Sequence, residues 1–255
     1  MRVVLIPGWN EGADQMRVFA DGRHGKPGLT ARGFECSVFD GGSGSLRDRI
    51  DQCKQFIAGL RAAAGAADER VALFGYSAGG LVARGVVRAY PDAPVAAIFQ
   101  LAAPNAGIVM DDPKGLLRRV HFDRSVLEDL DMESDFLRWL NGTHGHWVSG
   151  ARGSRERWIF DRAPWVTADG VPIANAVGRV PRYGMRGDGI VLVDSATLNG
   201  AVPHAFLDGK RANHLNLGGT WNPLTVVLRR WLSDDTYWPQ AVEMAAALYH
   251  ERPKR

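Results

Sequence analysis

Residues 71–90, VALFGYSAGGLVARGVVRAY, place Ser77 between a strand-like apolar run and a helix-like run. Gly75, Gly79 and Gly80 surround the serine. The pattern G-x-S-x-G is typical of a tight strand-to-helix turn that exposes the serine oxygen above a sheet, where small neighbours let the strand and helix approach. The alternative is that Ser77 only caps the helix through its hydroxyl. The surrounding runs favour the first interpretation.

The rest of the chain alternates short apolar runs with helical segments. Leu46, Ile50, Cys53, Ile57 and Leu60 recur every three or four residues and predict an amphipathic helix. Strands without polar alternation, separated by helices, predict an α/β fold with a mostly parallel central sheet and helices on both faces. The 255 residues, 45% of them hydrophobic, suffice for one domain over residues 1–255. The expected strands are 3–6, 35–39, 71–74, 95–101, 173–177 and 205–207.

Residues 105–166, called the insertion below, interrupt this alternation. They carry mixed charge and half of the eight tryptophans, and residues 127–140 predict one or two helices. We expect a lid over the active site, in which Phe136 and Trp139 line an acyl pocket with Asn105 at its mouth. The alternative is that Leu130, Phe136, Leu137 and Trp139 only pack the insertion onto the sheet.

Composition excludes several classes of protein. A net charge of +3, with 31 basic and 28 acidic residues, gives no indication of nucleic-acid binding. No apolar run approaches the roughly 20 residues that span a bilayer. Residues 1–8 do not resemble a signal peptide, so we expect a cytoplasmic protein, with leaderless export left open. Cys36 and Cys53 are expected as buried thiols, with one disulfide left open.

A nucleophilic serine needs a histidine base and a carboxylate to orient it. In α/β-hydrolases, which carry this serine turn, the acid follows the serine in the chain and the histidine follows the acid. Asp188 lies in a glycine-rich loop after the strand 173–177, and His214 follows it by 26 positions. We therefore predict Asp188 as the acid and His214 as the base.

Three other residues compete for these roles. Asp194 follows the run 190–193 and has no glycine beside it, so it ranks behind Asp188. His204 opens a strand-like run, which suits a structural role, and His250 lies in a basic terminal stretch.

The oxyanion of an acyl-transfer reaction needs two backbone donors. Ala78 follows the serine and is the usual first donor, and the second comes from the loop after an early strand. That loop is IPGWNEG at residues 6–12, so we predict the N–H of Trp9 as the second donor, with Asn10 as a lesser candidate. Asn10 is also expected to contact the substrate.

These motifs together resemble the α/β-hydrolase superfamily, and within it the lipase-like branch of small bacterial triacylglycerol lipases and glycosylphosphatidylinositol deacylases. The similar stretches, in order, are LIPGW, GYSAGG, GRVPRYGMRGDGIVLVDSA and NHLNL, and residues 125–141 resemble the helical stretch above such active sites. The resemblance implies a Ser77, Asp188 and His214 triad that cleaves carboxylic esters of lipid-like or other acyl substrates through an acyl-enzyme. It implies no metal and no organic cofactor.

Two departures from the family pattern lie at the mouth of the expected site. The first loop has Pro7-Gly8 where it usually begins with His-Gly in the family, and residues 103–107 are APNAG where many relatives have Thr-Pro-His-x-Gly. The acyl group and its leaving group therefore stay open. A thioesterase or an acyltransferase would use the same triad.

Proteins of other classes remain as alternatives. The stretch FDGGSGSL at residues 39–46 could cradle a phosphate, although it lacks the complete nucleotide-binding motifs. His144 and His146 lie two positions apart, but no carboxylate-histidine set completes a metal site. A non-catalytic interaction protein with this fold is the last alternative.

Overall fold

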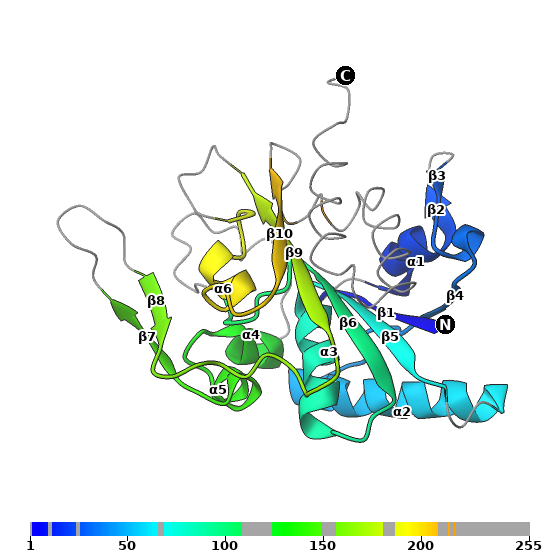
Figure 1. The fold of residues 1–255 in the computed structure, drawn as a ribbon, viewed down its shortest axis with the longest axis horizontal. Coiled ribbons are helices and arrows are strands. Elements are labelled where there is room, and N and C mark those ends of the chain that lie inside the picture. Colours follow the sequence, from blue (N-terminus) through cyan, green and yellow to red (C-terminus); the bar gives the residue numbers. More distant parts are fainter. Residues whose placement is uncertain are drawn as a thin grey trace.

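The computed structural model describes residues 2–9, 12–23, 26–65, 69–108, 124–148, 157–180 and 187–208, together with His214 and Leu217. Their centre is a six-stranded sheet (Figure 1) with the strand order β10-β9-β6-β5-β1-β4. Every neighbouring pair in this sheet is parallel. The prediction of a mostly parallel central sheet is confirmed.

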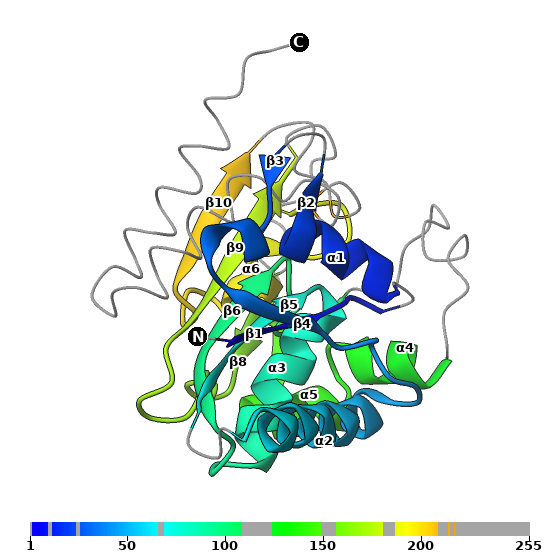
Figure 2. The same ribbon diagram turned by 90° about the vertical axis from the view of Figure 1, so that its right-hand side faces the viewer.

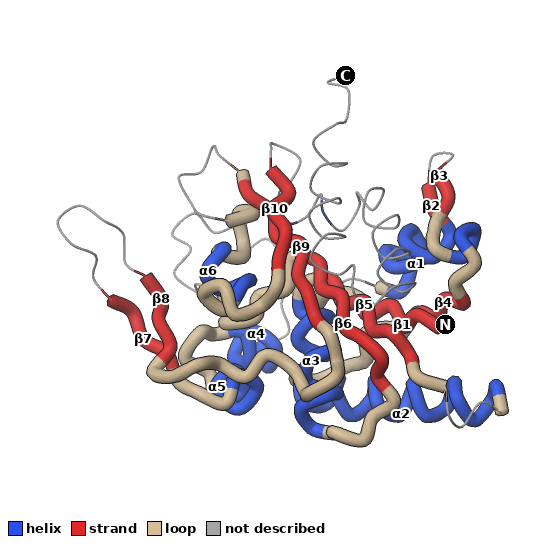
Figure 3. Tube along the Cα trace, in the orientation of Figure 1, coloured by secondary structure: helices blue, strands red, loops and turns tan. Residues whose placement is uncertain are grey.

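Each expected strand overlaps a strand of the sheet. Two short hairpins, one formed by β2 and β3 and the other by β7 and β8, were not predicted (Figure 3). The sheet strands are β1 (Arg2–Ile6), β4 (Glu35–Val38), β5 (Val71–Tyr76), β6 (Val95–Leu101), β9 (Ile173–Arg179) and β10 (His204–Asp208). The hairpin strands are β2 (Gly22–Arg23), β3 (Lys26–Pro27), β7 (Gly145–Val148) and β8 (Arg157–Phe160).

Helices cover both faces of the sheet (Figure 2). Alternate residues of each strand point to opposite faces, and apolar side chains on both faces are buried beneath helices. Val3 and Leu5 of β1 join the buried cluster that contains α1 (Ala13–Asp21). Val4 and Ile6 join the cluster that contains α2 (Leu46–Ala64) and α3 (Ala78–Ala89).

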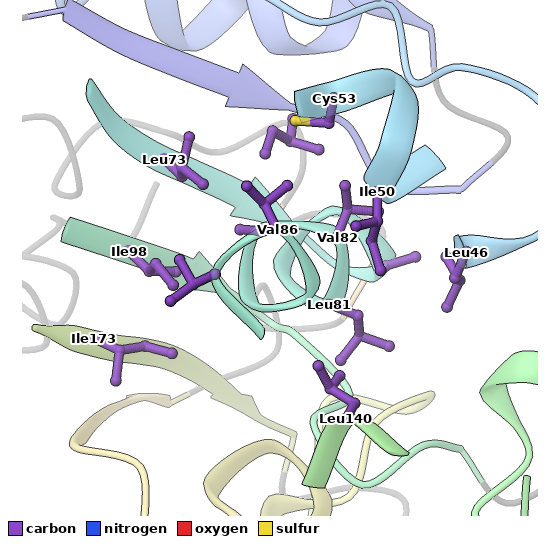
Figure 4. Close-up of a cluster of buried hydrophobic side chains, with 14 of the residues drawn as sticks. Leu46, Ile50, Cys53, Leu73, Leu81, Val82, Val86, Ile98, Leu140 and Ile173 are labelled. Atoms are coloured by element: carbon purple, nitrogen blue, oxygen red, sulfur yellow. The ribbon is translucent and has the colours of Figure 1, made fainter. Parts of the chain in front are cut away.

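The helices α2 and α3 pack closely on one face of the sheet. Ile50 and Cys53 of α2 lie near Val82 and Val86 of α3 (Figure 4). A Cβ at Gly85 of α3 would collide with the Ile50 side chain, so glycine lets the two helices approach. The predicted amphipathic helix is confirmed, and it continues to Ala64.

The insertion leaves the sheet after β6 and returns before β9. Its two described helices are α4 (Arg124–Leu130) and α5 (Asp135–Asn141), in agreement with the expected one or two helices. Phe136, Leu137 and Leu140 of α5 are buried in the same cluster as α2 and α3. The remaining short helices are α6 (Val193–Thr197) and the 3-10 turn η1 (Thr30–Arg32).

Within the described ranges, no helix has both the length and the apolar character needed to cross a membrane. Both cysteines are free thiols, so the disulfide that the sequence left open is absent between them. Cys53 is buried as expected, whereas Cys36 is only partly buried because it lies on the edge strand β4.

Candidate active site

Ser77 lies at the junction of β5 and α3, with φ 51° and ψ −126°. A positive φ is uncommon for a residue with a side chain, and such conformations cost about 1–3 kcal/mol. The Ser77 N–H donates to the Leu101 carbonyl at 2.8 Å, which ties the turn to the end of β6. The Ser77 side chain makes no capping hydrogen bond to α3. The structure therefore does not support the capping alternative.

The small residues around Ser77 are required by close backbone approach. A Cβ at Gly75 would collide with the Gly79 carbonyl, and a Cβ at Gly79 would collide with the carbonyls of Ile6 and Pro7. The loop after β1 thus passes directly against the first turn of α3.

His214 and Asp188 form one hydrogen-bonded chain with Ser77. The His214 Nε2 atom lies 2.8 Å from the Ser77 Oγ, and its Nδ1 atom lies 2.7 Å from the Asp188 Oδ2. An ionised carboxylate only accepts hydrogen bonds, so Asp188 assigns the ring proton to Nδ1. Nε2 is then free to accept the serine proton. The exposed fractions are 6% for His214 and 2% for Asp188.

A tight turn after β9 fixes the second carboxylate oxygen of Asp188. The Oδ1 atom accepts hydrogen bonds from the backbone N–H groups of Ile190 at 3.0 Å and Val191 at 2.8 Å. The Asp188 carbonyl accepts a further bond from the His214 N–H at 3.0 Å. Side chain and backbone together hold Asp188 and His214 in one relative orientation.

Sequence reasoning missed Tyr76, the residue directly before the serine. Its hydroxyl donates to the His214 carbonyl at 2.6 Å, and it is fully buried. The sequence feature that could have indicated it is an aromatic residue in a motif of otherwise small residues. Its partner, however, lies 138 positions away.

The expected oxyanion donors belong to two adjacent segments. Ala78 is the first residue of α3, and the buried Trp9 lies in the loop that passes against that helix. A helix N-terminus carries a partial positive charge that favours an anion. Asn10 lies outside the described residues.

The competing residues lie in other positions. Asp194 is in the first turn of α6, where its carbonyl accepts a hydrogen bond from Asn199. His204 opens β10, and its Nδ1 lies 2.9 Å from the Val202 carbonyl. His250 lies outside the described residues.

Asn105 is fully buried, and its side-chain amide is occupied by protein groups. Its Oδ1 accepts from Arg84 at 3.1 Å and Gln100 at 3.0 Å. Its Nδ2 donates to the Gln100 Oε1 and to the Ala196 carbonyl, both at 2.8 Å. This arrangement favours a structural role over the expected contact with substrate.

The aromatic pair of α5 packs toward α2. Phe136 has an exposed fraction of 2%, and its ring centroid is 5.8 Å from that of Trp139. The Arg47 guanidinium of α2 lies 4.5 Å from the Trp139 ring centroid and 5.9 Å from that of Phe136. These contacts favour the packing alternative, and an acyl pocket lined by the pair stays a prediction.

The glycine-rich loop before α2 is closed by side chains rather than open to phosphate. Asp129 accepts the Leu46 N–H at 2.7 Å, and Asp48 accepts the Ser45 N–H at 2.8 Å. Gln52 accepts the Ser43 N–H at 3.0 Å. Carboxylates at these amide groups disfavour a bound anion.

The histidines of the metal alternative also have other partners. His144 Nδ1 accepts from Arg138 at 3.3 Å, and His146 Nδ1 lies 2.8 Å from Asp161. Over the described ranges, no group of three or more histidine, cysteine and acidic side chains could hold a metal ion.

The chain is similar in structure to several bacterial and fungal hydrolases. The mature Bacillus licheniformis lipase BlEst2 has a TM-score of 0.61 and 14% identity, with 89% of this chain and 91% of the lipase covered. The Legionella pneumophila phospholipase PlaB has a TM-score of 0.65 and 17% identity, covering 98% of this chain and 63% of PlaB. Aspergillus fumigatus lipase B has a TM-score of 0.58 and 19% identity, covering 97% of this chain and 56% of the lipase.

At identities below 25%, these similarities show a shared fold and nothing further. This chain spans less than two thirds of the length of PlaB and of lipase B. No curated protein sequence matches the chain. The model of the palmitoyl protein thioesterase family matches residues 3–142, from β1 through α5, and includes Ser77. Because this match covers more than half of the 255 residues, the chain belongs to the palmitoyl protein thioesterase family, a lipase-like family of α/β-hydrolases.

Proposed function

We propose that the chain is a serine hydrolase that cleaves carboxylic esters of lipid-like or other acyl substrates through an acyl-enzyme. The observation that carries this proposal is the continuous hydrogen-bonded chain from the Ser77 Oγ through His214 to Asp188, with links of 2.8 Å and 2.7 Å. The strained backbone of Ser77 supports it, because strain of this kind is found where a side chain must be presented for chemistry.

In the acylation step, the Ser77 Oγ attacks the ester carbonyl carbon and its proton passes to the His214 Nε2. Asp188 keeps the other ring nitrogen protonated and stabilises the imidazolium. The tetrahedral oxyanion accepts hydrogen bonds from the backbone N–H groups of Ala78 and Trp9, each worth about 2.7–4 kcal/mol in comparable sites. Collapse expels the alcohol, which takes the proton from His214. Water then hydrolyses the acyl-enzyme by the same sequence of proton transfers.

Thioester hydrolysis is the second candidate, and membership of a palmitoyl protein thioesterase family favours it. The two reactions differ in the leaving group. A thiol has a pKa of about 8.5, so a thiolate can leave without full protonation, whereas an alkoxide needs the proton of His214. The same triad can therefore serve both substrates.

A serine-directed fluorophosphonate tests the proposal. Its adduct should appear on the peptide that contains Ser77, with parallel loss of activity toward p-nitrophenyl esters. Ethyl and S-ethyl esters of one acyl chain then separate the two candidates by their kcat/KM. An adduct on a different serine, with Ser77→Ala still active, would overturn the proposal.

A further inference from the structure

The guanidinium of Arg84 lies in the interior of the protein, on the inner face of α3. The residue is fully buried although it carries a charge. Burial lowers its pKa to about 9, so the group remains charged at neutral pH. A buried cation is costly unless hydrogen bonds replace its hydration. Its contacts must therefore supply that compensation.

The described acceptors of Arg84 are all neutral oxygens from the insertion and the loop after β6. Its Nε donates to the Val166 carbonyl at 3.0 Å, and its Nη2 donates to Asn141 Oδ1 at 3.1 Å and to the Trp165 carbonyl. Its Nη1 donates to Asn105 Oδ1 at 3.1 Å. Arg84 thus joins α3 to both ends of the insertion.

The same hydrogen bonds continue from Asn105 to the turn that holds Ser77. Asn105 Nδ2 donates to Gln100 Oε1 at 2.8 Å, and Gln100 Nε2 donates to the Gly80 carbonyl at 2.9 Å. Gly80 in turn donates its N–H to the Ser77 carbonyl at 2.9 Å. We call Arg84, Gln100, Asn105 and Asn141 the polar network.

The strained conformation of Ser77 explains what such a network is for. A residue with a side chain keeps a φ of 51° only when its surroundings over-determine it. The Leu101 carbonyl holds the Ser77 N–H at 2.8 Å from one side. On the other side, the hydrogen bond from Gln100 fixes Gly80 in the first turn of α3.

We infer that Arg84 is a positioning residue, which holds Ser77 in its reactive conformation through Asn105, Gln100 and Gly80. This inference rests on the proposed role of Ser77. It also gives the insertion a function in the reaction, because all four described acceptors of Arg84 belong to residues 105–166.

The test compares Arg84→Met and Gln100→Met with Arg88→Met as the matched control. Arg88 lies one turn further along α3, with its guanidinium 4.8 Å from the Trp165 ring centroid. The measurements are the rate of Ser77 phosphonylation at saturating fluorophosphonate, kcat and KM for p-nitrophenyl butyrate, and the urea midpoint of each variant. All assays are run under conditions where the urea curves show folded protein.

Arg84→Met and Gln100→Met should lower the phosphonylation rate and kcat by about 10²-fold, as expected for a reacting atom displaced by about 1 Å, with KM near the wild-type value. Arg88→Met should leave both rates close to wild type. Arg84→Lys, which keeps the charge and some donors, should recover part of the loss. If Arg84→Met does not fold, Gln100→Met and Arg84→Lys decide the question.

Two results would contradict the inference in different ways. A wild type without an adduct on Ser77 would overturn the proposed function and with it the role of Arg84. A wild type labelled at Ser77, with kcat in Arg84→Met and Gln100→Met no lower than in Arg88→Met, would overturn the role of Arg84 alone.

Discussion

The Tyr76 hydroxyl donates a hydrogen bond of 2.6 Å to the carbonyl of His214. The residue before the candidate nucleophile thus holds the backbone of the candidate base, and their ring centroids are 5.5 Å apart. Ser77 and His214 are therefore connected twice, once through the Oγ and Nε2 atoms and once through Tyr76.

Replacing Tyr76 by phenylalanine tests this second connection. The change removes the Tyr76 hydrogen bond to the His214 carbonyl, which contributes about 0.5–1.5 kcal/mol to stability. Turnover should fall about tenfold as His214 shifts, because a small displacement of a reacting group is costly. Tyr90→Phe is the control, since the Tyr90 hydroxyl contacts Asp51 at the surface. Equal turnover in the two variants would show that the Tyr76 hydroxyl does not position the base.

Ser77 and His214 should act as one unit. Ser77→Ala and His214→Ala should each lower kcat by about 10⁶-fold, and the double variant should be little worse, because both serve the same step. His204→Ala is the control for loss of a histidine near the sheet and should remain active. The measurement is kcat with a p-nitrophenyl ester, and additive losses in the double variant would contradict a shared mechanism.

The acid should be Asp188 and not Asp194. In Asp188→Asn, the amide can donate to Nδ1 and favour the wrong ring tautomer, which costs up to about 10⁴-fold in kcat in comparable triads. Asp194→Asn should stay near wild type, since Asp194 lies in the first turn of α6. A damaged Asp194→Asn beside an unaffected Asp188→Asn would reverse the assignment.

Thiol reagents should leave the enzyme active. Burial raises the pKa of Cys36 to about 11 and that of Cys53 to about 12. A raised pKa lowers the thiolate fraction, so at pH 8 nearly all of both thiols are protonated and unreactive. Iodoacetamide at pH 8 should neither modify the folded protein nor inhibit it, whereas the fluorophosphonate should. Rapid inhibition by iodoacetamide would place a reactive cysteine in the mechanism.

The positions of the sheet strands along the chain and the turn at Ser77 were predictable because both depend on local patterns, whereas the order of the strands in the sheet was not predicted. The apolar runs mark the strands, and the collisions of a Cβ at Gly75 or Gly79 explain the spacing of the motif. The position of Asp188 could also be predicted from the sequence, since a glycine-rich loop after a strand is a local feature.

The polar network could not be predicted from such patterns. Arg84 stands in the apolar run LVARGVV, which shows only that a charged residue lies on a buried helix. Its partners Asn105 and Asn141 are 21 and 57 positions away. The sequence predicted Asn105 at the mouth of the active site. In the structure, hydrogen bonds to Arg84, Gln100 and Ala196 keep its side chain in the protein interior. Whether a polar group is buried depends on its tertiary partners, and these lie too far along the chain for a short stretch of sequence to reveal them.

Alanine at Phe136 or Trp139 separates packing from substrate contact in the insertion. Phe136 is buried against α2 and α3, so Phe136→Ala should lower the free energy of unfolding by about 3–5 kcal/mol. If the pair only packs, the profile of kcat/KM from p-nitrophenyl acetate to palmitate should keep its shape, because each acyl methylene would still bury the same surface. Trp139→Ala should behave likewise with a smaller loss of stability, since Trp139 is only partly buried and contacts Arg47. Arg47→Met removes that contact without touching either ring and serves as the control. A folded Phe136→Ala whose preference for long chains disappears would instead show that the ring lines the acyl pocket, and the insertion would then act as a lid.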